Sequence, residues 1–465
     1  MPGRTGSTVV LFWVALVCFA AGGCGSGDED MMGPCPDCAN QTVTMANQAM
    51  ESALFDELNT TPERPSDVDF TAAFGLYEQA VSEDPGNRTA RFGAAVTGLL
   101  VLTTDAEVNA AFDEWDAYTE TPFDQNPIPK PGLLGIPVGL ATGADGLRLP
   151  FGVVATSVLA YLRLPLIAQD PQIGRIQAIF RERVIPRLVQ SVDHLGHVIS
   201  DPDYVFTVTA RMQGDLEADP AEIDHTDILL LRAAASLLTA ATRIAVAYDL
   251  NLAEYDVSVL RAAMQPGSGW LALTTDGTTH MQTARLDFLR AVGDVDAGLA
   301  SLLAETDLQD DDVIKIGPDG VSRTEIDDIR AEIPNVRALL ENGYTRIDDW
   351  DGSAATPDQA LAINVGNLLR DPIADWKALL PDYNVSFEGR YHEGDCVWVP
   401  VIEWQAATFE EWLLPDPTFH GLLPGIGSTN ELWNLFGVTA ADYEPRVVLD
   451  WTDPREVFNC EGTLP

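Results

Sequence analysis

The chain has 465 residues, of which 46% are hydrophobic, so it can form two or three domains with buried cores and is not a disordered protein. Acidic residues outnumber basic residues by 71 to 27, which gives a net charge of −44. Such a field repels nucleic acid and anionic lipid headgroups, and we therefore exclude nucleic acid as a partner. Among so many carboxylates some pairs meet by chance, so a pair of acids alone does not indicate acid–base catalysis.

The first 23 residues have the order of a signal peptide. Arg4 is followed by an apolar run at 9–21 and then by small residues up to Cys24. As a helix this run is roughly 20 Å long, too short to cross a bilayer core of about 30 Å. We therefore expect the segment to be removed on export.

The junction Ala-Gly-Gly-Cys at 21–24 resembles the bacterial lipobox, in which the cysteine thiol takes a diacylglyceryl group before cleavage. The resemblance implies a mature lipoprotein that begins at a lipidated Cys24, with palmitate among its acyl chains and the membrane as a partner. Ala21 stands where leucine is commonest in that motif, and the alternative is ordinary secretory cleavage beside an incidental cysteine. Gly25 in place of Asp favours the outer membrane under the sorting rule of enteric bacteria. Residues 24–40 start as a Gly- and Asp-rich run and predict a flexible tether.

Outside the signal segment and the lipidation site, the remaining cysteines are Cys35, Cys38, Cys396 and Cys460. An even number in an oxidising compartment predicts disulfides. Cys396 with Cys460 is the expected structural pair, and closing that loop stabilises by about 4 kcal/mol in the chain-entropy model. Cys35 and Cys38 form a C-P-D-C motif that is either a local clip or a thiol–disulfide redox pair. Its position soon after the lipid, with no strand–helix context, favours the clip.

Residues 41–118 have helical periodicity, clearest at 67–102. Ser66 and Asp69 form a capping box for one helix, and Asn87 can cap the next. The spacing is carried by Ala73, Tyr77, Ala80, Pro85, Ala94 and Ala95. It resembles a tetratricopeptide repeat, which implies a concave, helix-lined surface for a protein or peptide partner. A stand-alone helical pair is the alternative.

Residues 119–150 are rich in Pro and Gly and predict a connection to a second, α-helical domain at 151–380. There we predict helices at 151–168, 173–198 with a break near Pro186, 226–248 and 279–305, with further helix starts at Ser322 and Thr356. Short strands are expected at 204–212 and 270–274.

The helix at 226–248 is apolar enough to suggest a membrane span. Arg232 and Arg243 lie on one face of it, which favours a core helix with one solvent-exposed edge.

The composition changes after about residue 381. Six of the ten tryptophans fall from Trp376 onward, beside strand-like runs at 395–404 and 446–451. We predict a Trp-rich, β-containing cap at 381–465 whose strands the Cys396–Cys460 pair would join. The aromatic rings either stack on sugars or fill a core short of regular structure.

Two groups of residues suggest metal sites. His194 and His197 have helix spacing that can present two imidazoles to one ion, although the sequence identifies no third ligand. Asp348, Asp349 and Asp351 are a hypothetical Ca²⁺ site, because Ca²⁺ prefers oxygen ligands, but they lack the spacing of a calcium-binding loop. Solvated turns are the simpler interpretation, and no cofactor is expected.

The sequence has no nucleophile-elbow, zinc-protease, phosphate-loop or haem motif. We therefore predict a mainly α fold, with a helical-hairpin or tetratricopeptide-like body and a small Trp-rich terminal module. The expected function is non-catalytic: a lipid-anchored scaffold or binding protein of the cell envelope. A solute- or glycan-binding lipoprotein and a carboxylate-based hydrolase are the alternatives.

Overall fold

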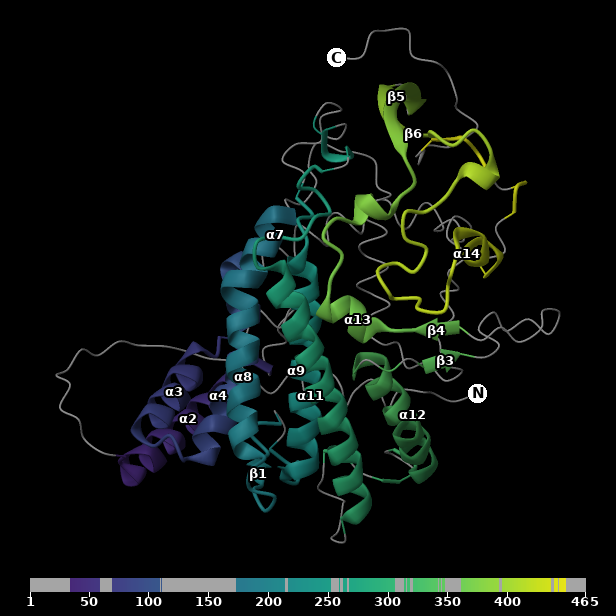
Figure 1. Ribbon diagram of the computed structural model, residues 1–465. Helices are drawn as coiled ribbons and strands as arrows, with labels where there is room; N and C mark the ends of the chain where they lie inside the picture. The colour runs from purple at the N-terminus through teal and green to yellow at the C-terminus, as the bar shows by residue number, and fades with distance from the viewer. Residues whose placement is uncertain are drawn as a thin grey trace, which may run out of the picture. The chain divides into compact units, whose positions relative to one another are not determined.

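The computed structural model describes residues 34–58, 69–108, 110, 173–213, 216–251, 259, 262–265, 267–305, 313–314, 316–317, 321–341, 343, 345–347, 361–392, 395–435, 439–441 and 443–448. Most of the residues in the elements of these ranges lie in α-helices, and the strands form small antiparallel sheets (Figure 1). The predicted fold class is confirmed: the chain is mainly α, with a small β-containing C-terminal part.

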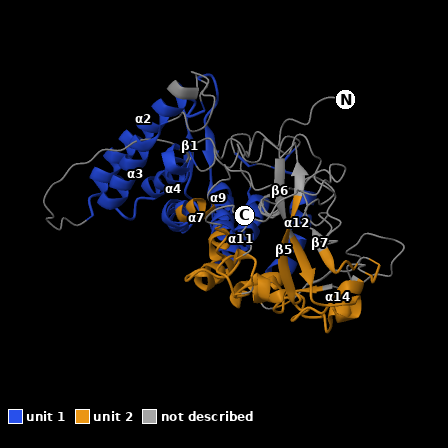
Figure 2. Ribbon diagram, turned by 90° about the horizontal axis from the view of Figure 1, so that it is seen from above, with its two compact units in different colours: residues 1–112, 179–242, 286–337 blue, residues 113–178, 243–285, 338–465 orange. Residues whose placement is uncertain are grey.

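The chain divides into two compact units (Figure 2). Unit 1 comprises 1–112, 179–242 and 286–337, and unit 2 comprises 113–178, 243–285 and 338–465. The helices are α2 (Pro36–Leu58), α3 (Thr71–Glu83), α4 (Arg88–Thr104), α7 (Ile173–Ile179), α8 (Ile185–Val198), α9 (His225–Ala247), α11 (Gly277–Ala304), α12 (Arg323–Glu341), α13 (Val365–Arg370) and α14 (Thr429–Leu435), with a π-helix at Phe180–Val184 and 3₁₀ turns at Trp376–Leu379 and Phe409–Glu411. The strands are β1 (Phe206–Val208), β2 (Ala221–Ile223), β3 (Thr345–Ile347), β4 (Leu361–Ile363), β5 (Tyr383–His392), β6 (Asp395–Trp404) and β7 (Arg446–Val448).

The N-terminal part of unit 1 is built from α2, α3 and α4, which pack in succession along the chain. Asn87 caps α4 as expected, because its side chain accepts the amide hydrogen of Ala90 at 2.9 Å. The apolar face predicted for α3 is buried, with Ala73, Tyr77 and Ala80 fully covered. These helices share one core with the end of α8 and with β1.

Glycine at position 93 allows α4 to approach α3 closely. A Cβ atom at Gly93 would lie 2.2 Å from the ring of Tyr77. That ring is fully buried, and its hydroxyl donates to Asn47 Oδ1 at 2.5 Å, so it is held from both sides. The sequence pattern drew attention to Ala94 and Ala95, which are buried, but the closest contact is made by the glycine before them.

The segment predicted to break near Pro186 is continuous, because the turn before the proline widens into a π-helix. Ile185 donates its amide hydrogen to the carbonyl of Phe180, five residues earlier. Proline has no amide hydrogen, and in a regular α-helix its ring clashes with the carbonyl four residues before it. The wider turn relieves that clash, and the helix continues into α8.

Arg232 on α9 does not lie on a solvent-exposed edge of the helix. It makes a two-pronged ion pair with Asp294 on α11, with Nε to Oδ2 at 2.7 Å and Nη2 to Oδ1 at 2.5 Å. Asp294 is buried, so the pair joins the two helices inside unit 1. Among the described helices, α9 alone is long and apolar enough to cross a membrane by length and composition, and 44% of its most apolar window is buried.

The capping box predicted at Ser322 is present at the start of α12. The Ser322 amide donates to Glu325 Oε2 at 2.8 Å, and the Glu325 amide donates to Ser322 Oγ at 3.2 Å. Hydrogen bonds from the Ser322 side chain and from its backbone amide to the Glu325 carboxylate lower the pKa of Glu325, which keeps this carboxylate ionised at the start of the helix. The helix then packs Ile326 against Leu302 of α11.

Unit 2 contains the β5–β6–β7 sheet. The two long strands pair antiparallel from Tyr383 with Trp404 to His392 with Asp395, and β7 pairs with the second half of β6. Strand β6 has the predicted bounds, whereas β5 was not predicted. The Tyr383 hydroxyl of β5 donates to the carbonyl of Met264 at 2.6 Å, so within unit 2 the sheet contacts a segment that lies before residue 381.

Residues 36–40, predicted as the end of a tether, form the start of α2, with proline at its first position, where no helical hydrogen bond is lost. The predicted strand at 204–212 is limited to β1, and 270–274 forms only isolated bridges. Helix α4, in the segment predicted at 41–118, packs against α8, in the segment predicted at 151–380.

Replacement of Gly93 by alanine should lower the free energy of unfolding by about 2 to 4 kcal/mol, since the new methyl group overlaps a buried ring that cannot move away. The control is Gly293→Ala in α11, where nothing lies within 4 Å of the added Cβ and the helix should gain about 0.5 to 1 kcal/mol. Urea unfolding measures both. Equal effects at the two positions would show that α3 and α4 are not in this close contact.

Candidate functional site

The contact between α4 and α8 buries a chain of polar side chains in unit 1. His194 of α8, whose side chain is 7% exposed, lies between Arg91 and Glu78. Its Nδ1 is 3.2 Å from Nη1 of Arg91, and its Nε2 is 3.2 Å from Oε1 of Glu78. Because arginine can only donate, the contact with Arg91 is a hydrogen bond when Nδ1 accepts and the ring hydrogen lies on Nε2, facing Glu78.

Gln190 and Arg187 continue this chain one helical turn earlier on α8. Gln190 donates from Nε2 to Glu78 at 3.0 Å and accepts from Arg187 Nη1 at 3.1 Å. The Arg187 guanidinium lies 4.3 Å from the centre of the Phe74 ring. Burial lowers the pKa of Arg187, while the charge of Glu78 acts in the opposite direction. The guanidinium therefore stays cationic although it is partly buried.

A hollow of about 320 Å³ opens where α4 ends and α8 begins. It is lined by Val101, Leu102, Asp105, Glu182, Arg183, Pro186, Arg187 and Gln190. The π-helix contributes Glu182 and Arg183, and such widened turns are frequent at functional sites. The volume is at the lower limit for small-ligand pockets, so the hollow fits one side chain or a small solute.

Two acids beside this hollow, Asp105 and Glu107, are paired with one arginine. Arg183 donates to Asp105 at 2.6 Å and to Glu107 at 2.8 Å. The hydrogen bond and charge of Asp105 raise the pKa of Arg183, and Glu107 adds to this effect. Asp105 also accepts the amide hydrogens of Glu107 and Val108, so it is held by the chain end of α4 as well as by Arg183.

The structure describes some of the cysteines and aspartates singled out from the sequence and not others. Cys24, Cys460 and the three aspartates Asp348, Asp349 and Asp351 lie outside the described residues. Cys396 lies on β6, paired in register with Tyr391 of β5. Cys35 and Cys38 are joined by a disulfide at the start of α2, with their Cα atoms 5.3 Å apart.

The structure does not bring His194 and His197 together as metal ligands. Both ring nitrogens of His194 face protein partners, whereas His197 is 56% exposed and lies 3.9 Å from Asp193. Within the described ranges there is no group of three or more His, Cys, Asp or Glu residues that could hold a metal ion.

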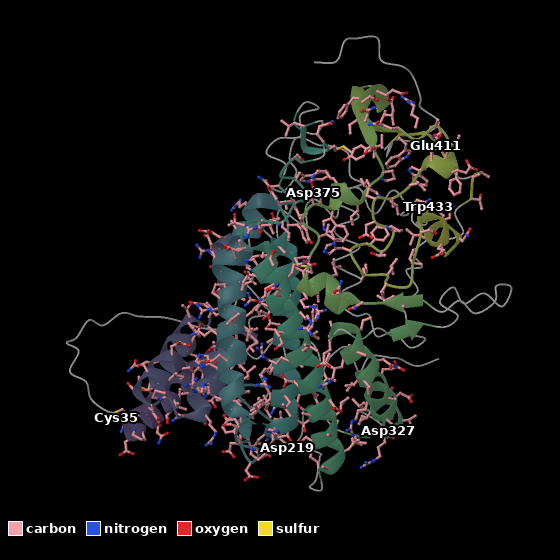
Figure 3. All side chains as sticks on the ribbon, viewed as in Figure 1. Cys35, Asp219, Asp327, Asp375, Glu411 and Trp433 are labelled. Atoms are coloured by element: carbon pink, nitrogen blue, oxygen red, sulfur yellow. A yellow bond between two sulfur atoms is a disulfide. The ribbon has the colours of Figure 1, made fainter. Side chains whose placement is uncertain are left out.

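Three of the described tryptophans of unit 2 form an aromatic cluster rather than an exposed row. Trp412 and Trp433 stack on each other, with ring centres 4.5 Å apart and planes 12° apart, and Trp404 packs 5.5 Å from Trp412 (Figure 3 labels Trp433). All three are half-buried. A sugar needs the flat face of a ring, and in this pair one face of each ring is already covered by the other.

Sequence reasoning missed the polar chain on α8 and also a buried lysine. Lys377 is 3% exposed and forms an ion pair with Asp375 at 2.9 Å, and its ammonium also contacts the carbonyl oxygens of Ser268 and Trp270. Lysine has three hydrogens to donate, so these partners satisfy it and make it a structural link in unit 2. The sequence signal was its rarity, since only three lysines occur in the chain.

The acidic excess, in contrast, is carried at the surface. Asp219, Asp327 and Glu411 are exposed (Figure 3).

No protein-family model, curated protein or solved structure matches the chain.

Replacing His194 with leucine should lower the free energy of unfolding by about 2 to 3 kcal/mol, because Arg91 and Glu78 each lose a buried partner. His197→Leu is the matched control on the same helix and should change stability by less than about 0.5 kcal/mol. Urea unfolding of both variants measures the difference, and equal losses would contradict the polar chain described here.

Proposed function

We propose that the chain is a lipid-anchored binding protein of the bacterial cell envelope. Its anchor is the acylated Cys24, and its binding surface is the helical body of unit 1, around the hollow between α4 and α8. The partner is a protein or peptide that places one side chain in the hollow. The outer membrane is the proposed location.

The observation that carries the export part of this proposal is the disulfide between Cys35 and Cys38, eleven residues after the lipobox cysteine. Disulfides persist mainly in oxidising compartments outside the cytoplasm. The apolar run and the small residues before Cys24 independently favour export.

Binding is a better proposal than hydrolysis because of the pairing around the hollow. A carboxylate hydrolase needs two acids a few ångströms apart, one of them able to carry a proton. Asp105 and Glu107 both accept hydrogen bonds from the guanidinium of Arg183, so neither faces the hollow as an unpaired acid. Three of the eight residues that line the hollow are apolar and five are polar or charged, so the hollow offers several polar groups to the side chain of a partner.

The full chain made in a bacterial host with labelled palmitate should incorporate the label and fractionate with membranes. Cys24→Ser should lose both properties, because the acyl chains supply nearly all of the membrane affinity of an acidic protein. Cys18→Ser, within the apolar run, is the control and should keep both. Label that remains in Cys24→Ser, or unchanged membrane fractionation, would overturn the proposed anchor.

A further inference from the structure

The Cys35–Cys38 disulfide has the local setting of a reactive pair. Cys35 immediately precedes α2, and its carbonyl accepts the first helical hydrogen bond, from the Ala39 amide at 3.0 Å. It is therefore the residue that caps the helix, and Cys38 lies in the first turn. Cys38 is exposed and Cys35 is half-buried, so a reagent in solution reaches the disulfide from the side of Cys38.

We propose that this disulfide is a thiol–disulfide exchange site for a dithiol protein. The inference goes beyond the binding function and does not depend on the lipid anchor. It rests on three features of the pair together: the covalent bond between residues three apart, the exposed residue Cys38, and the position of Cys35 at the start of a helix.

The exchange has a defined direction of attack. A thiolate of the partner attacks Cys38 Sγ, a partner–Cys38 disulfide forms, and the Cys35–Cys38 bond breaks with its electron pair on Cys35 Sγ. The second partner thiolate then attacks the partner sulfur of the mixed disulfide and releases Cys38. Two protons complete the reaction, so the chain gains two electrons and two protons and the partner dithiol becomes a disulfide.

Cys35 is the better leaving group of the two. A thiolate at the capping position accepts amide hydrogens of the first helical turn and lies at the positive end of the helix dipole. Both effects lower the pKa of a cysteine thiol, and a thiol of lower pKa leaves faster.

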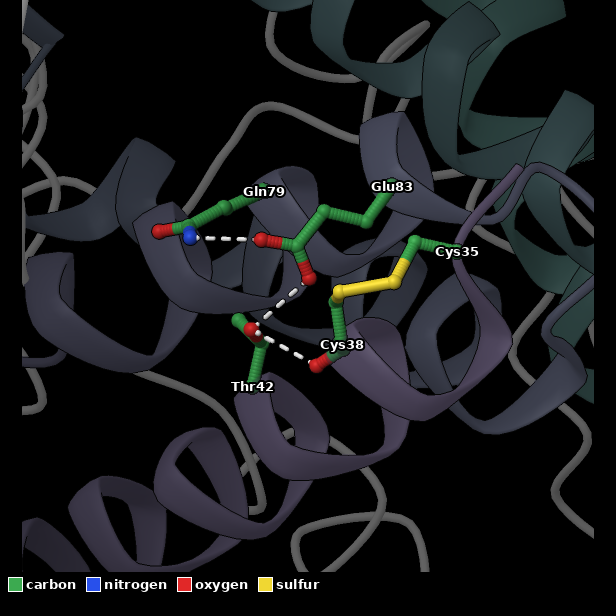
Figure 4. The surroundings of a disulfide bond; sticks show 5 residues. All are labelled: Cys35, Cys38, Thr42, Gln79 and Glu83. Atoms are coloured by element: carbon green, nitrogen blue, oxygen red, sulfur yellow. Dashed lines mark hydrogen bonds between the residues drawn. A yellow bond between two sulfur atoms is a disulfide. The ribbon is translucent and has the colours of Figure 1, made fainter. Parts of the chain in front are cut away.

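Two acids oppose this effect, and the structure restrains one of them (Figure 4). Asp37 is exposed in the first turn of α2. The Glu83 carboxylate accepts from Gln79 at 2.7 Å and lies 2.8 Å from the Thr42 hydroxyl, which is also 3.1 Å from the Cys38 carbonyl oxygen. These hydrogen bonds share the negative charge of the Glu83 carboxylate with neighbouring donors and hold the carboxylate in one position.

Reduction does not require the helix to unfold. The first turns of α2 bury Ala39 and Val43 against Ala80 and Ala90, and the Cys35 amide donates to the Glu83 carbonyl at 2.8 Å. None of these contacts involves a sulfur atom. The disulfide can therefore open and close on a folded protein.

The full chain, purified in detergent, is incubated with reduced glutathione as the probe, and peptide mass spectrometry after alkylation gives the redox state of Cys35 and Cys38. The pair should be reduced while circular dichroism and the melting temperature stay nearly unchanged. A pair that resists excess glutathione, or whose reduction unfolds the helices, is a structural clip and overturns the proposal.

Single-cysteine variants test the direction of attack. Cys38→Ser leaves the Cys35 thiol, which iodoacetamide should alkylate about threefold to tenfold faster at neutral pH than the Cys38 thiol left in Cys35→Ser, because its pKa lies below the ordinary value of about 8.5. Glu83→Gln should increase the rate at Cys35 further. Equal rates at the two cysteines, or a Cys35 pKa at or above the ordinary value, would overturn the assigned leaving group.

Discussion

The close approach of α3 to α4 sets the geometry of the helical body in unit 1. Helix α4 carries small residues on the side that faces α3, and at Gly93 the ring of Tyr77 occupies the space that any side chain would take. The same helix packs against α8. The distance between these helices therefore determines both the buried polar chain through His194 and the hollow at the end of α4.

The charges of the chain follow a consistent rule in both units. Acids such as Asp219, Asp327 and Glu411 lie exposed, where their charge favours solubility, while several buried or half-buried cations have a defined partner. Arg232 pairs with Asp294, Lys377 with Asp375, and Arg187 lies over the Phe74 ring. With few lysines available, arginine makes most of these contacts, because its planar fork can bind two oxygens at once.

Sequence patterns predicted the features that depend on residues close together in the chain. They predicted most described helices, the Asn87 cap, the Ser322 capping box and the bounds of β6. They did not predict contacts between distant segments, such as His194 with Glu78, because spacing within one helix carries no information on the neighbouring helix. Pro186 predicted a disturbance, but whether a helix breaks or widens there depends on tertiary packing. The tetratricopeptide resemblance remains a prediction.

We propose unit 1 as the binding surface of a membrane-anchored protein, with α4 and α8 as the walls of its hollow. The most direct measurement is photo-crosslinking in the producing cells, with a photoreactive amino acid at Gln190 in the hollow and, as a control, at the exposed Leu380 in unit 2. The account predicts one discrete adduct from position 190 that is absent from position 380 and depends on the intact Cys24. Equal adducts at both positions, or none from position 190, would contradict it.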